Sequence, residues 1–149
     1  MYFVDRKKIE ETLAYIESLH APFEEIKPLQ SKVERLALER IAQGWVEAII
    51  DVGNQMIDGF IMRDPGSYID IIDILWDEKV VTKENADQLK AIIGLRKLLV
   101  QSYTTIDHAH FLHVLTKNHQ AIKEFPQRVQ AYLDEELGPV SAFLPDDKE

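Results

Sequence analysis

The chain has no cysteine among its 149 residues, which excludes a disulfide framework and a zinc site built on thiolates. No apolar run approaches the roughly 18 residues that a membrane-spanning helix needs. The first residues also lack the apolar segment of a signal peptide. Alternation of apolar and polar residues, the pattern of a half-buried strand, is almost absent. These absences predict a cytoplasmic protein that is soluble, has no membrane contact and contains little or no β-sheet.

The formal net charge is −9 at pH 7. This charge argues against non-specific attraction to nucleic acid, which requires a basic surface, although it is compatible with a local basic pocket. Hydrophobic residues make up 46% of the chain, enough for one core that folds without a metal. We therefore expect a single domain over 1–144, followed by a flexible acidic tail at 145–149.

Helical spacing of apolar residues runs through most of the sequence. It predicts five helices, over about 5–20, 31–61, 68–77, 83–105 and 107–137. Pro22 and Pro28 mark the first connection, and Pro126 is expected to kink or restart the last helix. The prediction is an all-α, up-and-down bundle of about five helices, with the second and fourth packed together at its centre.

A polar row interrupts the apolar surface of the second helix. Its members are Glu47, Asp51, Asn54 and Asp58, which the spacing i, i+4, i+7, i+11 places on one face. The row is either a solvent-facing stripe or a set of partners for basic side chains. A divalent-metal site is the third possibility, but it favours a second acidic cluster or paired Glu-x-x-His motifs, and neither is present. We expect no metal and no cofactor, and we expect Arg96 to contact Asp51 or Glu47 when no ligand is bound.

The predicted fourth helix carries the most informative segment. Arg96, Tyr103 and Asp107 are spaced i, i+7, i+11 and would share one face of an unbroken helix, with Gln101 about 140° round from Arg96. The Arg96 fork suits a phosphate, and Tyr103 adds a hydroxyl on a stackable ring. These residues could hold a phosphodiester. Alternatively, Arg96 pairs with an acid of the second helix and Tyr103 packs at the edge of the core.

This segment resembles the signature of the HepT-like family of the HEPN superfamily, and within it the YutE-like group of bacterial cytosolic proteins. The signature is Arg, four residues, His, one residue, Tyr, followed shortly by an Ile-Asp pair. Arg96, Tyr103 and Ile106-Asp107 match it in type and spacing. Further similarity is found around Asp51 and Asn54, in the segment 60–75 with its Arg-Asp-Pro-Gly, and in Leu-Gly-Pro-Val-Ser-Ala-Phe at 137–143.

The resemblance implies a metal-independent endoribonuclease that acts as a symmetric dimer, with the motif helices of both chains meeting in a cleft. In that chemistry the histidine exchanges a proton and the arginine steadies the phosphate charge. Here Gln101 occupies the histidine position. Glutamine forms hydrogen bonds but has no pKa near neutrality, and losing acid–base help lowers a rate about 10²- to 10⁴-fold. The implied site comprises Arg96, Gln101 and Tyr103, supported by Glu47, Asp51, Asn54 and Asp107.

The resemblance also implies a partner, a minimal nucleotidyltransferase antitoxin that adenylylates Tyr103. Two hypotheses stay open: an attenuated HepT-like ribonuclease subunit of a toxin–antitoxin pair, and a non-catalytic dimeric module that binds a nucleotidyltransferase, a nucleotide or RNA. Whether the chain is an enzyme depends on Gln101. His108, His110 and His113 follow the motif. One of them could replace the missing base, and surface or packing roles are the alternative.

Overall fold

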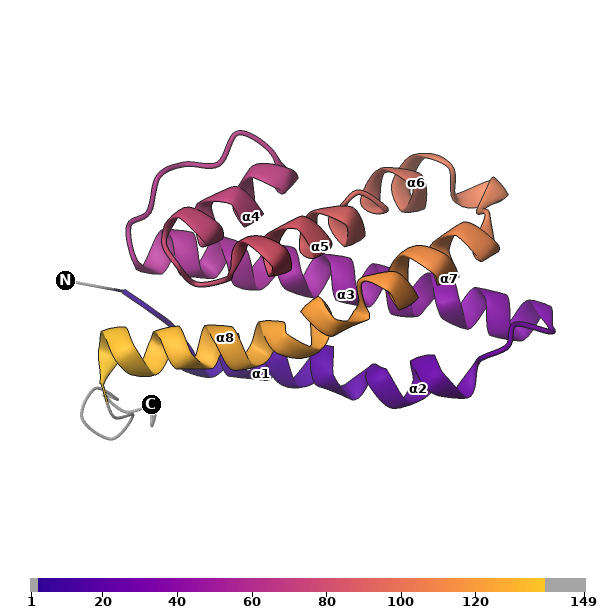
Figure 1. Ribbon diagram of the computed structural model, residues 1–149, viewed down its shortest axis with the longest axis horizontal. Helices are drawn as coiled ribbons and strands as arrows, with labels where there is room; N and C mark the ends of the chain where they lie inside the picture. Colours follow the sequence, from indigo (N-terminus) through magenta and orange to yellow (C-terminus); the bar gives the residue numbers. More distant parts are fainter. Residues whose placement is uncertain (1–2, 139–149) are drawn as a thin grey trace.

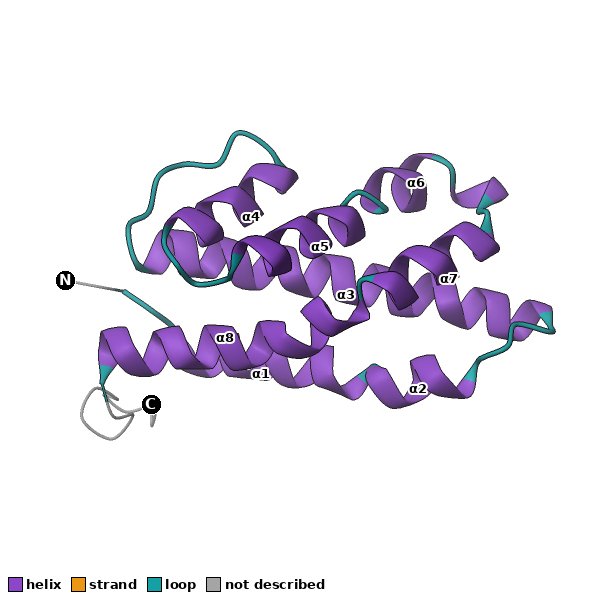
Figure 2. Cartoon of the chain, viewed as in Figure 1, coloured by secondary structure: helices purple, strands orange, loops and turns teal. Residues whose placement is uncertain are grey.

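The computed structural model describes residues 3–138, which form helices and no strand (Figure 2). This confirms the all-α prediction. The elements are α1 Arg6–Ser18, α2 His20–Glu25, α3 Lys32–Gly59, α4 Tyr68–Asp77, α5 Lys83–Ile93, α6 Arg96–Gln101, the 3₁₀ turn η1 Tyr103–Thr105, α7 His108–Lys117 and α8 His119–Leu137. Within 3–138, no helix is both long and apolar enough to span a bilayer. The expected end of the domain at residue 144 and the tail at 145–149 lie outside the described residues.

Helix α3 is the axis of the bundle and runs along its long dimension (Figure 1). It packs against α1, α2, α4, α5, α6 and α7, while α8 lies against α1 and α5. The apolar stripe of α3 makes this possible, because Trp45, Ile49 and Met56 repeat at helical spacing and are fully buried. The Trp45 indole Nε1 donates to the Ile16 carbonyl at 2.9 Å, which satisfies its one polar group. As predicted, α3 contacts the fourth predicted helix, but its largest interfaces are with α1 and α4.

The helix starts follow the N-capping residues of the sequence. Asp5, Ser67 and Thr82 each accept a hydrogen bond from a backbone N–H in the first turn of the next helix. Ser31 and Glu34 form a reciprocal capping box at the start of α3. The second and third predicted helices therefore match α3 and α4 within two residues.

Two predicted helices are interrupted, and one short helix was missed. Helix α2 occupies the predicted connection, where Pro22 is tolerated because the N–H groups of a first turn need no partner within the helix. The fourth predicted helix breaks at Gly94, and α6 ends at Gln101. The fifth breaks at Asn118, whose side-chain Nδ2 donates to the Val114 carbonyl at 2.9 Å, and α8 begins at the next residue. The helix does not restart at Pro126, since α8 continues through it.

Gly53 sets the close approach of α3 and α4. A Cβ at this position would lie 2.4 Å from Cγ2 of the buried Ile71. We expect Gly53→Ala to lower the free energy of unfolding by about 1–2 kcal/mol, because overpacking outweighs the gain in helix propensity. Urea denaturation measures this change. Gly66→Ala is the control, since Gly66 is exposed and its Cβ would meet nothing closer than 3.7 Å; an equal or stabilising effect at Gly53 would contradict the prediction.

Candidate functional site

Arg96, the first residue of α6, is held by side chains from two other helices. Its Nε donates to Glu47 Oε2 of α3 at 2.8 Å, which confirms the predicted contact with an acid of the polar row. Its Cζ lies 4.4 Å from the ring centroid of Tyr68, at the start of α4. Arg96 is 29% exposed, and within residues 3–138 its two terminal nitrogens have no hydrogen-bond partner. These nitrogens are the part of the fork that can bind an anion.

The rest of the motif does not continue the α6 helix. Gln101 ends α6, and Tyr103 begins the η1 turn. Asp107 caps α7 by accepting from the His110 N–H at 3.1 Å. The prediction that Arg96, Tyr103 and Asp107 share one helix face is therefore wrong. Gln101 is exposed and Tyr103 is 67% exposed. In the described part of the chain no hydrogen bond joins Arg96, Gln101 and Tyr103 to one another, so a single protomer presents them as separate groups on its surface.

The polar row of α3 is partly a solvent-facing stripe and partly a partner for a basic side chain, so both alternatives apply. Glu47 is a partner for Arg96, whereas Asp51 and Asp58 are exposed and Asn54 is half-buried. Partial burial, and then the charge of Glu47, raise the pKa of Asp51 above its usual value, against an opposing effect of Lys8. Across residues 3–138, no group of three or more His, Asp or Glu side chains is placed to hold a metal ion.

The histidines after the motif lie on α7. His108 Nε2 is 2.6 Å from Glu39 Oε2, a contact that ties the start of α7 to α3. His110 and His113 are exposed. In the described chain none of them forms a hydrogen bond or ion pair with Gln101 or Arg96. Within residues 3–138, no replacement for the motif histidine is therefore hydrogen-bonded to these two residues.

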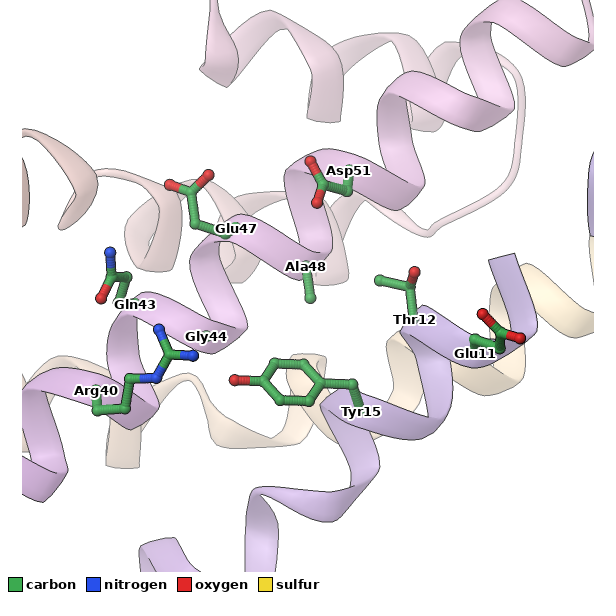
Figure 3. A pocket seen from close by; sticks show the side chains of 9 residues that line it. All are labelled: Glu11, Thr12, Tyr15, Arg40, Gln43, Gly44, Glu47, Ala48 and Asp51. Atoms are coloured by element: carbon green, nitrogen blue, oxygen red, sulfur yellow. The ribbon is translucent and has the colours of Figure 1, made fainter. Parts of the chain in front are cut away.

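A groove of about 310 Å³ lies between α1 and α3, beside Glu47. Figure 3 shows Tyr15 of α1 reaching toward α3 near Gly44, while Glu47 and Asp51 project from α3 along the same side. Gly44 allows this approach, because a Cβ there would lie 2.7 Å from the Tyr15 hydroxyl. The residues that line the groove are Glu11, Thr12, Tyr15, Arg40, Gln43, Gly44, Glu47, Ala48 and Asp51.

Sequence reasoning missed Tyr68, Glu39 and the groove residues Tyr15 and Arg40. Ser67 as an N-cap does place Tyr68 in the first turn of α4. No spacing rule links that turn to Arg96, which follows 28 residues later on a different helix. Only the packing of α4 and α6 beside α3 brings the two together.

The chain matches known proteins along most of its length. The family model "Ribonuclease HepT-like" matches residues 9–129. The Bacillus subtilis (strain 168) protein named "Putative RNase YutE" is 52% identical over 143 residues, which cover 96% of this chain and 99% of that protein. The solved structure of B. subtilis YutE, described as a cytosolic protein of unknown function, superposes with a TM-score of 0.91 and 52% identity, covering 96% of this chain and all of that one.

More distant solved structures share the fold. A toxin–antitoxin structure with AMP-PNP has a TM-score of 0.75 at 20% identity and covers 83% of this chain and 97% of that one. A tri-AMPylated Shewanella oneidensis HEPN toxin in complex with its MNT antitoxin has a TM-score of 0.63 at 22% identity, covering 83% and 91%. The family match and the identity to YutE, together with the Arg96 and Tyr103 positions, lead to one conclusion: the chain belongs to the HepT-like family of the HEPN superfamily.

Proposed function

We propose that this protein is a HepT-like ribonuclease-type subunit of a nucleotidyltransferase-linked toxin–antitoxin pair, attenuated because Gln101 stands at the motif's histidine position. It acts in the cytosol as a homodimer on RNA, without metal or cofactor. The observation that carries the proposal is the state of Arg96. Its guanidinium is held at the surface by Glu47 and Tyr68, with both terminal nitrogens free of protein partners within residues 3–138.

The motif residues divide the work in this proposal. Arg96 binds the phosphodiester and stabilises the negative charge that grows on it in the transition state. Gln101 orients the substrate through hydrogen bonds but transfers no proton. Glu47 orients Arg96, while Asp51 and Asn54 border the same face of α3, and Asp107 fixes the start of α7. No residue of the described chain takes over as base, hence the attenuation.

Tyr103 is the proposed site of adenylylation by a nucleotidyltransferase partner. Its side chain is 67% exposed and therefore accessible to another protein. Transfer of an adenylyl group from ATP to its hydroxyl oxygen, with release of pyrophosphate and of the hydroxyl proton, would add bulk and negative charge to the motif that contains the RNA-binding arginine. The support from relatives is the S. oneidensis HEPN toxin, which is AMPylated and bound to an MNT antitoxin.

The second candidate is a non-catalytic dimeric module that binds a nucleotidyltransferase, a nucleotide or RNA. Gln101 favours this candidate, since no histidine of the described chain forms a hydrogen bond with it. One experiment separates the two: labelled single-stranded RNA is incubated with the protein in the presence of a chelator. Slow cleavage that Arg96→Ala abolishes supports the ribonuclease. Binding without cleavage, weakened by Arg96→Ala, supports the module as an RNA-binding protein. Neither binding nor cleavage contradicts both the ribonuclease and the RNA-binding module, and leaves a module that binds a nucleotide or a nucleotidyltransferase.

The apolar surface around the motif supports the proposed dimer, which the family resemblance implies. Leu98, Val100 and Tyr103 are 37%, 52% and 67% exposed, and a two-fold interface would bury them. We expect light scattering to give about twice the 17.2 kDa chain mass. Val100→Asp should raise the dissociation constant about a hundredfold, because two aspartates would face each other across the two-fold axis.

Ile61→Asp is the matched control for the dimer. Ile61 is 70% exposed and lies in the connection between α3 and α4, outside the motif segment 96–107. It should leave the dimer intact. A monomer at micromolar concentration for the parent protein, or equal effects of Val100→Asp and Ile61→Asp, would contradict the proposed interface.

A further inference from the structure

Glu47 alone is a weak anchor for Arg96. The two side chains share one hydrogen bond, from Nε, and Glu47 is 41% exposed. Solvent-exposed ion pairs of this kind contribute little and restrict the arginine poorly, because water competes for both partners. With the hydrogen bond from Nε to Glu47 alone, the guanidinium plane can rotate about the line that joins Nε and Oε2. A second contact is therefore needed to fix the direction in which the terminal nitrogens point.

Tyr68 supplies that contact. Its ring centroid lies 4.4 Å from Arg96 Cζ, within the range in which a guanidinium is attracted to the face of an aromatic ring. Stacking on a ring defines the plane of the guanidinium, which the Glu47 bond does not. Since Glu47 and Tyr68 belong to α3 and α4, the two contacts together place Arg96 relative to two different helices.

The position of Tyr68 is in turn set by the connection between α3 and α4, which arches over to the start of α4 in Figure 1. Arg63 donates to both carboxylate oxygens of Asp70, at 2.9 and 3.1 Å, and the Gly66 N–H donates to Asp70 Oδ2 at 2.9 Å. Ser67 caps the same turn by accepting from the Asp70 N–H. We call Arg63, Gly66 and Asp70 the α4 clamp.

We propose that Tyr68 is the positioning residue of this site: anchored by the α4 clamp, its ring holds the Arg96 guanidinium so that the two terminal nitrogens face an incoming RNA phosphodiester. The RNA part of this inference rests on the proposed function. The contact between Arg96 and the Tyr68 ring is a property of the free protein and is tested separately. The inference also gives the Arg-Asp-Pro-Gly segment a role, because Arg63 and Gly66 belong to it.

The first test observes the stacked arginine without RNA. In a ¹⁵N NMR spectrum, the Arg96 Nε–H signal, assigned by its loss in Arg96→Lys, should show the shift that an aromatic ring imposes. Tyr68→Phe keeps the ring and should preserve this shift. Tyr68→Leu keeps apolar volume without a ring and should remove it. An Arg96 signal unchanged by Tyr68→Leu would overturn the inference.

The second test uses binding of a fluorescein-labelled oligouridylate, followed by anisotropy. Tyr68→Leu should weaken binding about three- to tenfold, the size expected from loss of a cation–π contact, and Tyr68→Phe should restore it. Trp76→Leu is the matched control: Trp76 is an exposed aromatic on the same helix, with Lys83 over its ring at 5.4 Å. Equal weakening by Trp76→Leu would show a general effect of α4 and overturn the role of Tyr68.

The third test addresses the α4 clamp. Asp70→Asn removes the Arg63–Asp70 ion pair, while Arg63 keeps its weaker contact with Asp77 at 3.3 Å, and should move the Arg96 NMR signal toward its position in Tyr68→Leu. Asp73→Asn removes another ion pair of α4, with Lys90 at 2.5 Å, and should leave the signal in place. If Asp70→Asn and Asp73→Asn shift the Arg96 signal alike, the effect on Arg96 is not specific to the α4 clamp. If the NMR results hold but no variant or parent binds RNA, the stacked arginine stands and the proposed function fails.

Discussion

Gln101→His is expected to raise the rate of metal-free cleavage of single-stranded RNA at least about tenfold over the parent protein, well within the usual range for acid–base help. Gln101 lies exposed at the end of α6, so an imidazole meets no packed neighbours there. The glutamine and histidine side chains have similar reach. In the described chain, the terminal nitrogens of Arg96 already lack hydrogen-bond partners. The substitution therefore adds only the missing proton carrier.

The pH profile provides a second signature of the same variant. A histidine that transfers a proton makes the rate depend on pH near its ordinary pKa of about 6.5. The parent protein should lack this dependence, because glutamine does not titrate. Gel quantification of RNA cleavage across this pH range, with a chelator present, measures both the gain and its profile.

Two variants control for unrelated effects of a new imidazole. Arg96→Ala in the Gln101→His protein should abolish the gain, because the phosphate charge is then left without its cation. Lys97→His places a histidine at another exposed position of α6 and should give no gain. If Gln101→His folds as a dimer but cleaves no faster on several RNAs, more than one group has been lost from the cleft, and the binding-module hypothesis replaces the ribonuclease.

The difference between the predicted and observed helices has a local cause. Across Gly94, the apolar residues Ile92, Ile93, Leu95 and Leu99 keep helical spacing, so the pattern predicts one continuous helix. The break is visible only in backbone hydrogen bonds, where the Leu95 N–H bonds to the Ile92 carbonyl. Periodicity reports which side of a segment faces the core: α5 buries Leu89, Ile92 and Ile93, whereas α6 has no fully buried residue and its Leu99 is partly buried against the core. The apolar periodicity does not reveal that the helix is interrupted between α5 and α6.

The residues of the site that pair through charge could be predicted from the sequence, whereas the residues that helix packing brings together could not. A half-buried guanidinium requires an acid, and the polar row of α3 supplied Glu47. The aromatic partner Tyr68 could not be inferred, because aromatic residues are common on helix surfaces and nothing in the sequence relates α4 to α6. The same limit applies to the groove, which exists only because α1 crosses α3 where Gly44 lacks a side chain.

A pair of histidines near the centre of the bundle gives the protein an expected sensitivity to acid. His20 Nδ1 lies 2.8 Å from His119 Nε2, joining the starts of α2 and α8. The His119 ring also packs within 5.4 Å of the Trp45 ring and 5.1 Å of the Phe23 ring, centroid to centroid. Burial first, and then the charges of His20 and Lys123, lower the pKa of His119 to about 4.

Protonation of this pair should destabilise the fold. The pKa of His20 is lowered as well, chiefly by burial and by Lys123, with Glu17 and Glu24 opposing. For His119, Lys27 also lowers the pKa and Glu24 raises it. Because the folded pKa lies below the unfolded value of 6.5, the unfolded chain binds more protons between these two values. The contribution of this pair to the free energy of unfolding is therefore fully present above about pH 6.5, and it is lost as the pH falls toward about 4.

We expect this pair to account for a loss of about 2 kcal/mol in the free energy of unfolding over that interval, less than the full pKa shift implies because the rings are only partly buried. Urea denaturation at a series of pH values measures it. Carboxylates titrate over part of the same range, so the informative quantity is the difference between the parent and His119→Gln, which should depend less steeply on pH. His113→Gln, which alters an exposed histidine of α7, should keep the parent's dependence. Equal pH dependence in the parent and His119→Gln would show that this pair does not couple protonation to folding.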